Sequence, residues 1–150
     1  MIDEKDFRII FELKKNSRNS TKQIAENVCM PRVTVHDRIK KMVKNNIIKK
    51  FTILPDYEKL GLMTTVFVFV ASNPYESKVS ISKIAQKIKS FPGVYEVHIV
   101  SGEYDLLLKI RGKSFDEVGK NTIAKIRQVP GVGRTFTCPC FTTVKEDLAP

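Results

Sequence analysis

A seven-residue segment occurs twice in the second half of the chain, and it restricts the fold more than any other feature. Residues 88–94 (IKSFPGV) are matched by residues 126–132 (IRQVPGV). In each copy a run of apolar residues with helical spacing ends at Pro-Gly, and a strand-like run starts at the following valine. Two helix–Pro-Gly–strand units predict the order βαββαβ.

The segments around this repeat supply the remaining elements. Residues 63–71 are apolar on both faces, as in a central strand, and residues 94–100, 104–110 and 132–144 predict three more strands. Residues 77–90 and the segment capped by Ser114 have helical apolar stripes. We therefore expect a ferredoxin-like βαββαβ sandwich. Two helices cover only one face of a four-stranded sheet, so the other face predicts a homodimer through the sheets.

The first half of the chain has helical periodicity. Asp3 is placed to cap a first helix whose apolar side is Phe7, Ile10 and Leu13, joined by Ile9. Residues 20–23 (STKQ) match a capping box at the start of a short second helix. These two elements indicate an α+β protein with a helical N-terminal half.

A turn containing Pro31 leads to a third predicted helix over residues 32–44. Its buried stripe is formed by Val35, Ile39, Met42 and Val43. At its end, residues 45–46 are asparagines, which tolerate the left-handed conformation common there. Residues 47–54 predict a strand.

Basic side chains concentrate around the third helix. The chain has 26 Lys and Arg against 16 Asp and Glu, a formal charge of +10. Residues 31–50 contain seven of these cations and one acid, Asp37, so this segment alone is +6. A capped short helix, a tight turn and a basic helix are the order of a helix-turn-helix. A lysine-rich surface without a partner is the alternative reading.

The helix-turn-helix interpretation gives candidate DNA-binding residues. Side chains near the helix start are expected to read bases, and the other cations to bind phosphate. The candidates are Arg32, Val33, Thr34, His36, Arg38, Lys40, Lys41 and Lys44.

Several other classes of protein do not fit the residues present. Three cysteines, Cys29, Cys138 and Cys140, cannot all pair within the chain, which favours reduced thiols and a cytoplasmic protein. They supply too few ligands for a closed zinc site, so we expect no metal or other cofactor. The longest apolar run, residues 66–71, is strand-sized, so no membrane span is expected. Because the sequence offers no nucleophile–base pair and no phosphate loop, we do not expect an enzyme.

These segments resemble the Lrp/AsnC, or feast/famine, transcriptional regulators of bacteria and archaea. The resemblance rests on residues 2–6 (IDEKD) with 9–10 (II), 34–41 (TVHDRIKK), 47–51 (IIKKF), 60–61 (LG) and 102–105 (GEYD). Two places depart from the family pattern. Residues 29–31 (CMP) stand where Gly-Leu-Ser is frequent, and Asn46 stands where the family has glycine.

The resemblance implies a division of labour along the chain. Residues 1–54 would form a winged helix-turn-helix domain, residues 55–61 a linker, and residues 62–150 a domain for effector binding and oligomerisation. The protein would bind double-stranded DNA sequence-specifically as a homodimer, and such dimers often assemble into octamers. The alternative that stays open is an architectural, chromatin-like DNA-binding protein without an effector.

The resemblance also implies an effector site between subunits, usually for an amino acid. Carried over position by position, the site contains Gly102, Tyr104, Asp105, Thr135 and Thr137. The Asp105 carboxylate would accept from the effector's ammonium group. The Gly102 N–H and the two threonine hydroxyls would hold its carboxylate.

Overall fold

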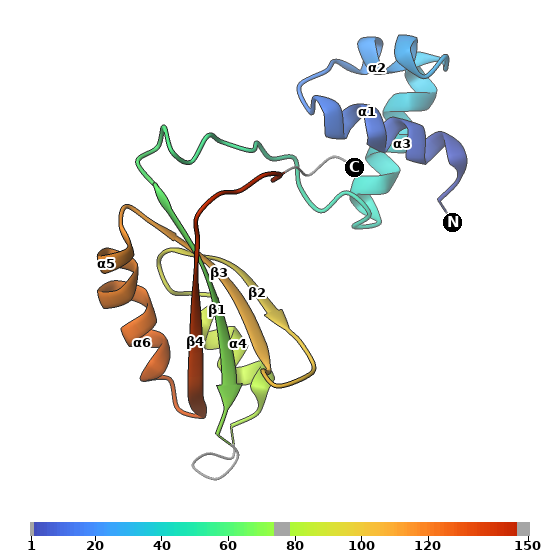
Figure 1. The fold of residues 1–150 in the computed structure, drawn as a ribbon. Helices are drawn as coiled ribbons and strands as arrows, with labels where there is room; N and C mark the ends of the chain where they lie inside the picture. Colours follow the sequence, from blue (N-terminus) through green and yellow to red (C-terminus); the bar gives the residue numbers. More distant parts are fainter. Residues whose placement is uncertain (1, 74–78, 147–150) are drawn as a thin grey trace. The chain divides into compact units, whose positions relative to one another are not determined.

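The computed structural model describes residues 2–73 and 79–146, and the chain divides into two compact units, Met1–Pro55 with Lys145–Pro150, and Asp56–Val144. The N-terminal unit consists of helices α1 (Glu4–Lys15), α2 (Thr21–Asn27) and α3 (Arg32–Lys44) (Figure 1). Both predicted caps are present. The Asp6 N–H donates to the Asp3 carboxylate at 2.9 Å, and the Gln23 N–H donates to the Ser20 hydroxyl at 3.3 Å. Local cap chemistry therefore fixes where α1 and α2 begin.

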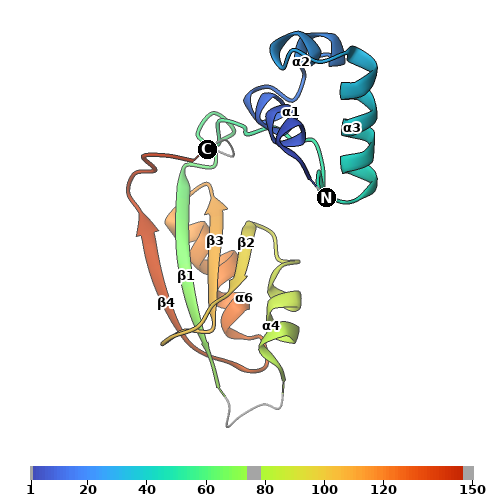
Figure 2. The ribbon, with the colours of Figure 1, turned by 90° about the vertical axis from the view of Figure 1, so that its right-hand side faces the viewer.

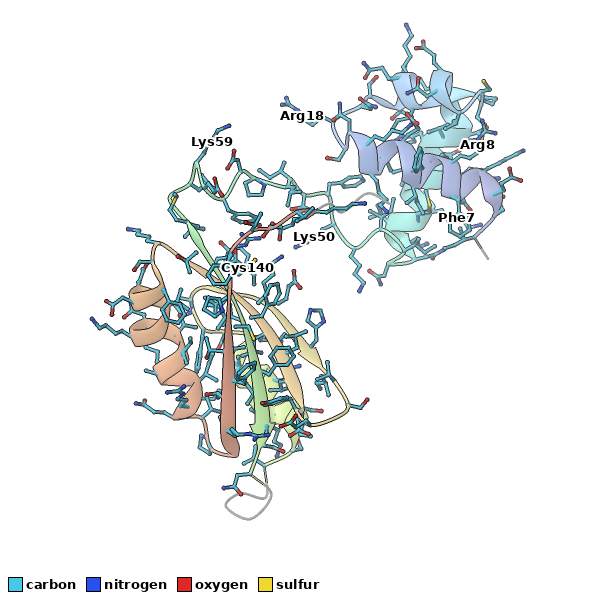
Figure 3. All side chains as sticks on the ribbon, in the orientation of Figure 1. Phe7, Arg8, Arg18, Lys50, Lys59 and Cys140 are labelled. Atoms are coloured by element: carbon cyan, nitrogen blue, oxygen red, sulfur yellow. The ribbon has the colours of Figure 1, made fainter. Side chains whose placement is uncertain are left out.

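The core of this unit is small and lies between the three helices. Its fully buried side chains include Ile9, Val35 and Met42, but Phe7 is 62% exposed on α1 (Figure 3). The expectation that Phe7 lies on the buried side was wrong. Ile9 is the buried residue, and because residues two apart on a helix point about 200° from each other, Phe7 faces away from the core. Val43, also expected in the core, is 42% exposed, whereas its neighbour Met42 is buried.

Among the described residues of this unit, two other than glycine have a left-handed backbone. Cys29 has φ +53° in the turn before α3, and Asn46 has φ +55° after it. The expectation for the asparagines is thus confirmed at Asn46. A side chain with a Cβ atom is disfavoured in this conformation, and asparagine is better tolerated than cysteine.

Replacing Cys29 with glycine is therefore expected to stabilise the N-terminal unit by up to about 1 kcal/mol, because glycine adopts a positive φ without steric strain. Thermal unfolding of the variant measures the change. Cys29→Ala is the matched control, since alanine keeps the Cβ atom and loses only the thiol. Equal unfolding temperatures for the two variants would show that the positive φ at Cys29 does not destabilise the protein.

Residues 47–54 do not form the strand that their sequence predicts. The N–H groups of Ile47 and Ile48 donate to the Met42 carbonyl at 2.9 and 3.2 Å, which closes the end of α3. The residues that follow are assigned no strand pairing within the described ranges. A strand needs a neighbour to accept its backbone hydrogen bonds, so β propensity alone does not form one here.

The C-terminal unit is a single antiparallel sheet with helices on one face (Figure 2). Its strands are β1 (Thr64–Ser72), β2 (Val94–Ile99), β3 (Leu106–Gly112) and β4 (Val132–Cys140), in the order β2-β3-β1-β4. The helices are α4 (Ile81–Ile88), α5 (Phe115–Val118) and α6 (Ala124–Arg127), with a π-helical turn, Gly119–Ile123, joining the last two. The predicted βαββαβ order and ferredoxin-like sheet are confirmed. Part of the predicted 77–90 helix lies outside the described residues.

The two Pro-Gly copies have the same backbone structure. Gly93 and Gly131 have φ +82° and +89°. In each copy the valine after the glycine donates to the carbonyl three residues earlier, at 3.2 Å for Val94 and 3.0 Å for Val132. A Cβ atom on Gly93 would lie 2.9 Å from the Arg111 carbonyl oxygen. The repeat thus marks two equivalent turns that require glycine.

The sheet has one face against the helices and one without helices. Val66, Val68 and Val70 of β1 are buried under the helices with residues of β3, including Leu108. Alternate side chains point the other way. Hereafter the open face means Phe67, Phe69, Tyr104, Leu107, Phe136 and Cys138, which the strand register and ring contacts bring together. The strand predicted over 132–144 ends at Cys140, and Phe141 is fully exposed.

Candidate DNA-binding and effector sites

One side of α3 is exposed within its unit. Val33, His36, Asp37, Lys40 and Lys44 are exposed and follow the spacing of one helical face. Hereafter they form the outer face of α3, with exposed Arg32 and Lys41 at its edges. None of these side chains has an ion pair or hydrogen bond to another described residue. Four cations and one acid are therefore available to an external partner.

The remaining two predicted DNA-binding residues, Thr34 and Arg38, lie off this face. Thr34 is half-buried. Arg38 Nη1 donates to both oxygens of Asp3 and to Asp6 Oδ1, each at 2.8 Å. Since two carboxylates neutralise this guanidinium, we assign Arg38 the role of joining α3 to the start of α1. Sequence reasoning missed this pairing because Asp3 and Asp6 are remote from Arg38 along the chain.

The Asp3–Arg38 contact has a consequence for acid stability. The Asp6 N–H and the Arg38 guanidinium hydrogen-bond to Asp3 and lower the pKa of its carboxyl below the ordinary value of 3.8. A group whose pKa is lowered by folding stabilises the protein above its ordinary pKa. That contribution is lost as the pH falls through the lower, folded value.

We expect Arg38→Ala to lower the unfolding temperature at neutral pH, with a difference from the unmodified protein that shrinks in acid below pH 3.8. Lys41→Ala is the matched control, because Lys41 is an exposed cation of the same helix without an ion pair. Thermal unfolding across this pH range provides the measurement. A destabilisation by Arg38→Ala that stays constant into acid would argue against the ion pair.

Asp105 lies immediately before β3 and accepts hydrogen bonds from Ser72, the last residue of β1. The Ser72 N–H and hydroxyl both donate to its Oδ2 at 2.7 Å. These two bonds lower the pKa of the Asp105 carboxyl. No partner within the described chain bonds its other oxygen. Asp105 is therefore an ionised carboxylate at neutral pH with one oxygen available, beside the turn that Gly102 makes with φ +133°.

Tyr104 belongs to an aromatic cluster on the open face. Its ring centroid is 5.4 Å from that of Phe69 and 6.4 Å from that of Phe136. The Arg134 guanidinium lies 5.2 Å from the Tyr104 ring centroid. Sequence reasoning did not place Phe69, Phe136 or Arg134 beside Tyr104, because the cluster depends on the register of β1 against β4.

Thr135 and Thr137 point to the other side of the sheet. They pair with Val70 and Val68 of β1, whose side chains lie under the helices, and directly paired residues share a face. The Arg127 Nε–H donates to the Thr135 hydroxyl at 2.9 Å. Within one chain, the two threonines and Tyr104 therefore lie on opposite faces of the sheet.

The described residues contain no group of three His, Cys, Asp or Glu side chains placed to hold a metal ion. In the same part of the chain, no helix is both long and apolar enough to cross a membrane.

Comparison with protein families gives two matches that together span most of the chain. Residues 2–49 match the winged helix-turn-helix DNA-binding model, and residues 65–150 match the Lrp/AsnC ligand binding domain. The chain is 45% identical to an uncharacterised HTH-type transcriptional regulator of Pyrococcus furiosus, over 99% of this chain and 98% of the relative. It is 32% identical to the HTH-type transcriptional regulator FL11 of Pyrococcus horikoshii, over 97% and 93% of the two chains.

A solved structure has the same fold. It is a transcriptional regulator of Neisseria meningitidis in complex with L-Met, with a TM-score of 0.84 and 18% identity, covering all of this chain and 96% of that chain. At this identity the likeness establishes the fold, and the two family models establish the kind of domain in each half.

Proposed function

The chain belongs to the Lrp/AsnC family of DNA-binding transcriptional regulators, and from this premise we propose that it binds DNA as a homodimer whose affinity changes when an amino acid binds. Regulation of transcription through a helix-turn-helix and a ligand-binding domain is the function of this family. The family is one of regulators, which confirms the expectation that the chain is not an enzyme.

The outer face of α3 is the observation that carries the DNA-binding proposal. Four cations have no acidic partner in the described chain: Arg32, Lys40, Lys41 and Lys44. Because their charges are not already neutralised, their binding to DNA phosphates contributes most to affinity. With α3 in the major groove, the side chains near its start, Val33 and His36, meet base edges. Thr34 and Arg38 lie outside this face, and Arg38 joins α3 to the start of α1.

The open face supports the proposal of a dimer. A second copy of the chain is the partner that covers an aromatic sheet face in a symmetric way. Two copies of α3 would then read a pseudo-palindrome whose half-sites are one helical turn of DNA apart, or a multiple of it. Higher assembly, such as an octamer, is a further prediction that light scattering with and without amino acids tests.

The free oxygen of Asp105 supports an amino acid as the effector. An ionised carboxylate with an unused acceptor suits an ammonium group. We keep Gly102, Tyr104, Thr135 and Thr137 as further contacts. Because the two threonines and Tyr104 lie on opposite sheet faces of one chain, they reach one ligand only if different subunits supply them.

Calorimetry against each of the twenty amino acids tests this site. We expect one or a few to bind, and Asp105→Ala to abolish binding. Ser72→Ala is the matched control: it removes one hydrogen bond to Asp105 but leaves its carboxylate in place, so binding should persist. If none of the amino acids binds the unmodified protein, the effector proposal fails.

A further inference from the structure

Asp37 is an acidic side chain in the middle of a basic surface. On the outer face of α3 it lies one turn after Val33 and one turn before Lys40 and Lys41. It is exposed, and it forms no ion pair or hydrogen bond with either lysine or with any other described side chain. It differs in this from Asp3 and Asp6, which neutralise Arg38. No described cation therefore pairs with the Asp37 carboxylate where DNA is proposed to dock.

A carboxylate on such a face is unfavourable beside phosphate and favourable only beside a hydrogen-bond donor. Within the major groove, the exposed donors are the amino groups of cytosine and adenine, whereas guanine and thymine present acceptors toward a carboxylate. An aspartate pairs with the cytosine amino group, and it has no donor with which to bond the neighbouring purine nitrogen of adenine.

On this basis, and resting on the proposed DNA binding by α3, we propose that Asp37 reads a cytosine in each half-site. The carboxylate accepts a hydrogen bond from the cytosine N4 amino group. It disfavours guanine and thymine at that position because acceptor then faces acceptor. Asp37 sets sequence preference while Lys40, Lys41 and Lys44 supply affinity.

The test uses the full-length protein and a pool of duplexes with randomised sequence. The site selected by the unmodified protein is then varied one base pair at a time, and binding is measured for that protein, Asp37→Asn and Asp37→Ala. Glu26→Ala is the matched control, since it removes one exposed carboxylate of the same unit, on α2 rather than α3.

We expect one position per half-site to require cytosine, with a loss of about tenfold or more for any other base. Asp37→Ala should lose that preference alone, and Asp37→Asn should move it toward adenine, which an amide bonds on both N6 and N7. The inference is overturned if Asp37→Ala raises affinity for every duplex equally, as Glu26→Ala should. A failure of the unmodified protein to select any sequence would instead reject the proposed function.

Discussion

Simultaneous replacement of Lys40, Lys41 and Lys44 with alanine is expected to weaken DNA binding on the order of 100-fold at moderate salt. Each lysine is exposed and without an acidic partner in the described chain, so its charge is available to phosphate. If each neutralises one phosphate, the slope of log K against log salt should decrease by about 2.7, or about 0.9 for each lost contact. Gel shifts at several salt concentrations measure both quantities.

The matched control removes the same charge from the other unit. Lys83, Lys87 and Lys89 are exposed on or next to α4, and their replacement with alanine should leave most of the affinity and the salt slope intact. The unfolding temperature should change little in either triple variant, because none of these side chains is buried. If both variants weaken binding equally, the outer face of α3 is not the principal DNA contact.

Phe136→Glu is expected to dissociate the homodimer and to weaken binding to a two-half-site duplex on the order of 100-fold or more. Phe136 is 52% exposed within one chain, so glutamate is tolerated there in a monomer. In the proposed dimer the same position is covered by the partner, and an unpaired carboxylate would be buried. Sedimentation or light scattering gives the mass, and gel shifts give the affinity.

Phe115→Glu provides the comparison for this variant. Phe115 is 50% exposed at the start of α5, away from the open face, and an acid is favourable in a first helical turn. The Phe115→Glu variant should remain a dimer and bind DNA with the affinity of the unmodified protein. A dimeric Phe136→Glu with normal affinity would show that the open face is not the subunit interface.

Much of the fold follows from local signals in the sequence. Asp3 and Ser20 cap α1 and α2 as predicted, since a cap bonds to an N–H only three residues away. The Pro-Gly copies mark two strand starts, because glycine at Gly93 and Gly131 supplies the positive φ that each turn needs.

What the sequence did not predict depends on contacts between distant segments. Residues 47–54 have strand propensity but no strand assignment, because pairing depends on a partner and not on composition. Arg38 matches a DNA-contacting pattern, yet it is bound by Asp3, the N-cap of α1, and by Asp6 within α1. Phe7 fits an apolar helical stripe in the sequence, but the three-helix packing selects Ile9 instead.

The two candidate sites also differ in how far the sequence alone predicts them. The cations of α3 are adjacent along one helix, so their common face follows from helical periodicity alone. The effector residues come from different strands, and only the register shows that Thr135 and Thr137 face away from Tyr104. The free oxygen of Asp105 is likewise visible only once Ser72 is seen to bind the other.

DNA footprinting of the full-length protein on long genomic fragments, with and without amino acids, tests the central claim most directly. The account predicts discrete protected segments with two related half-sites, and a shift in the protein concentration needed for protection when one amino acid is added. Uniform protection along every fragment, unchanged by any amino acid, would contradict it and favour an architectural DNA-binding protein.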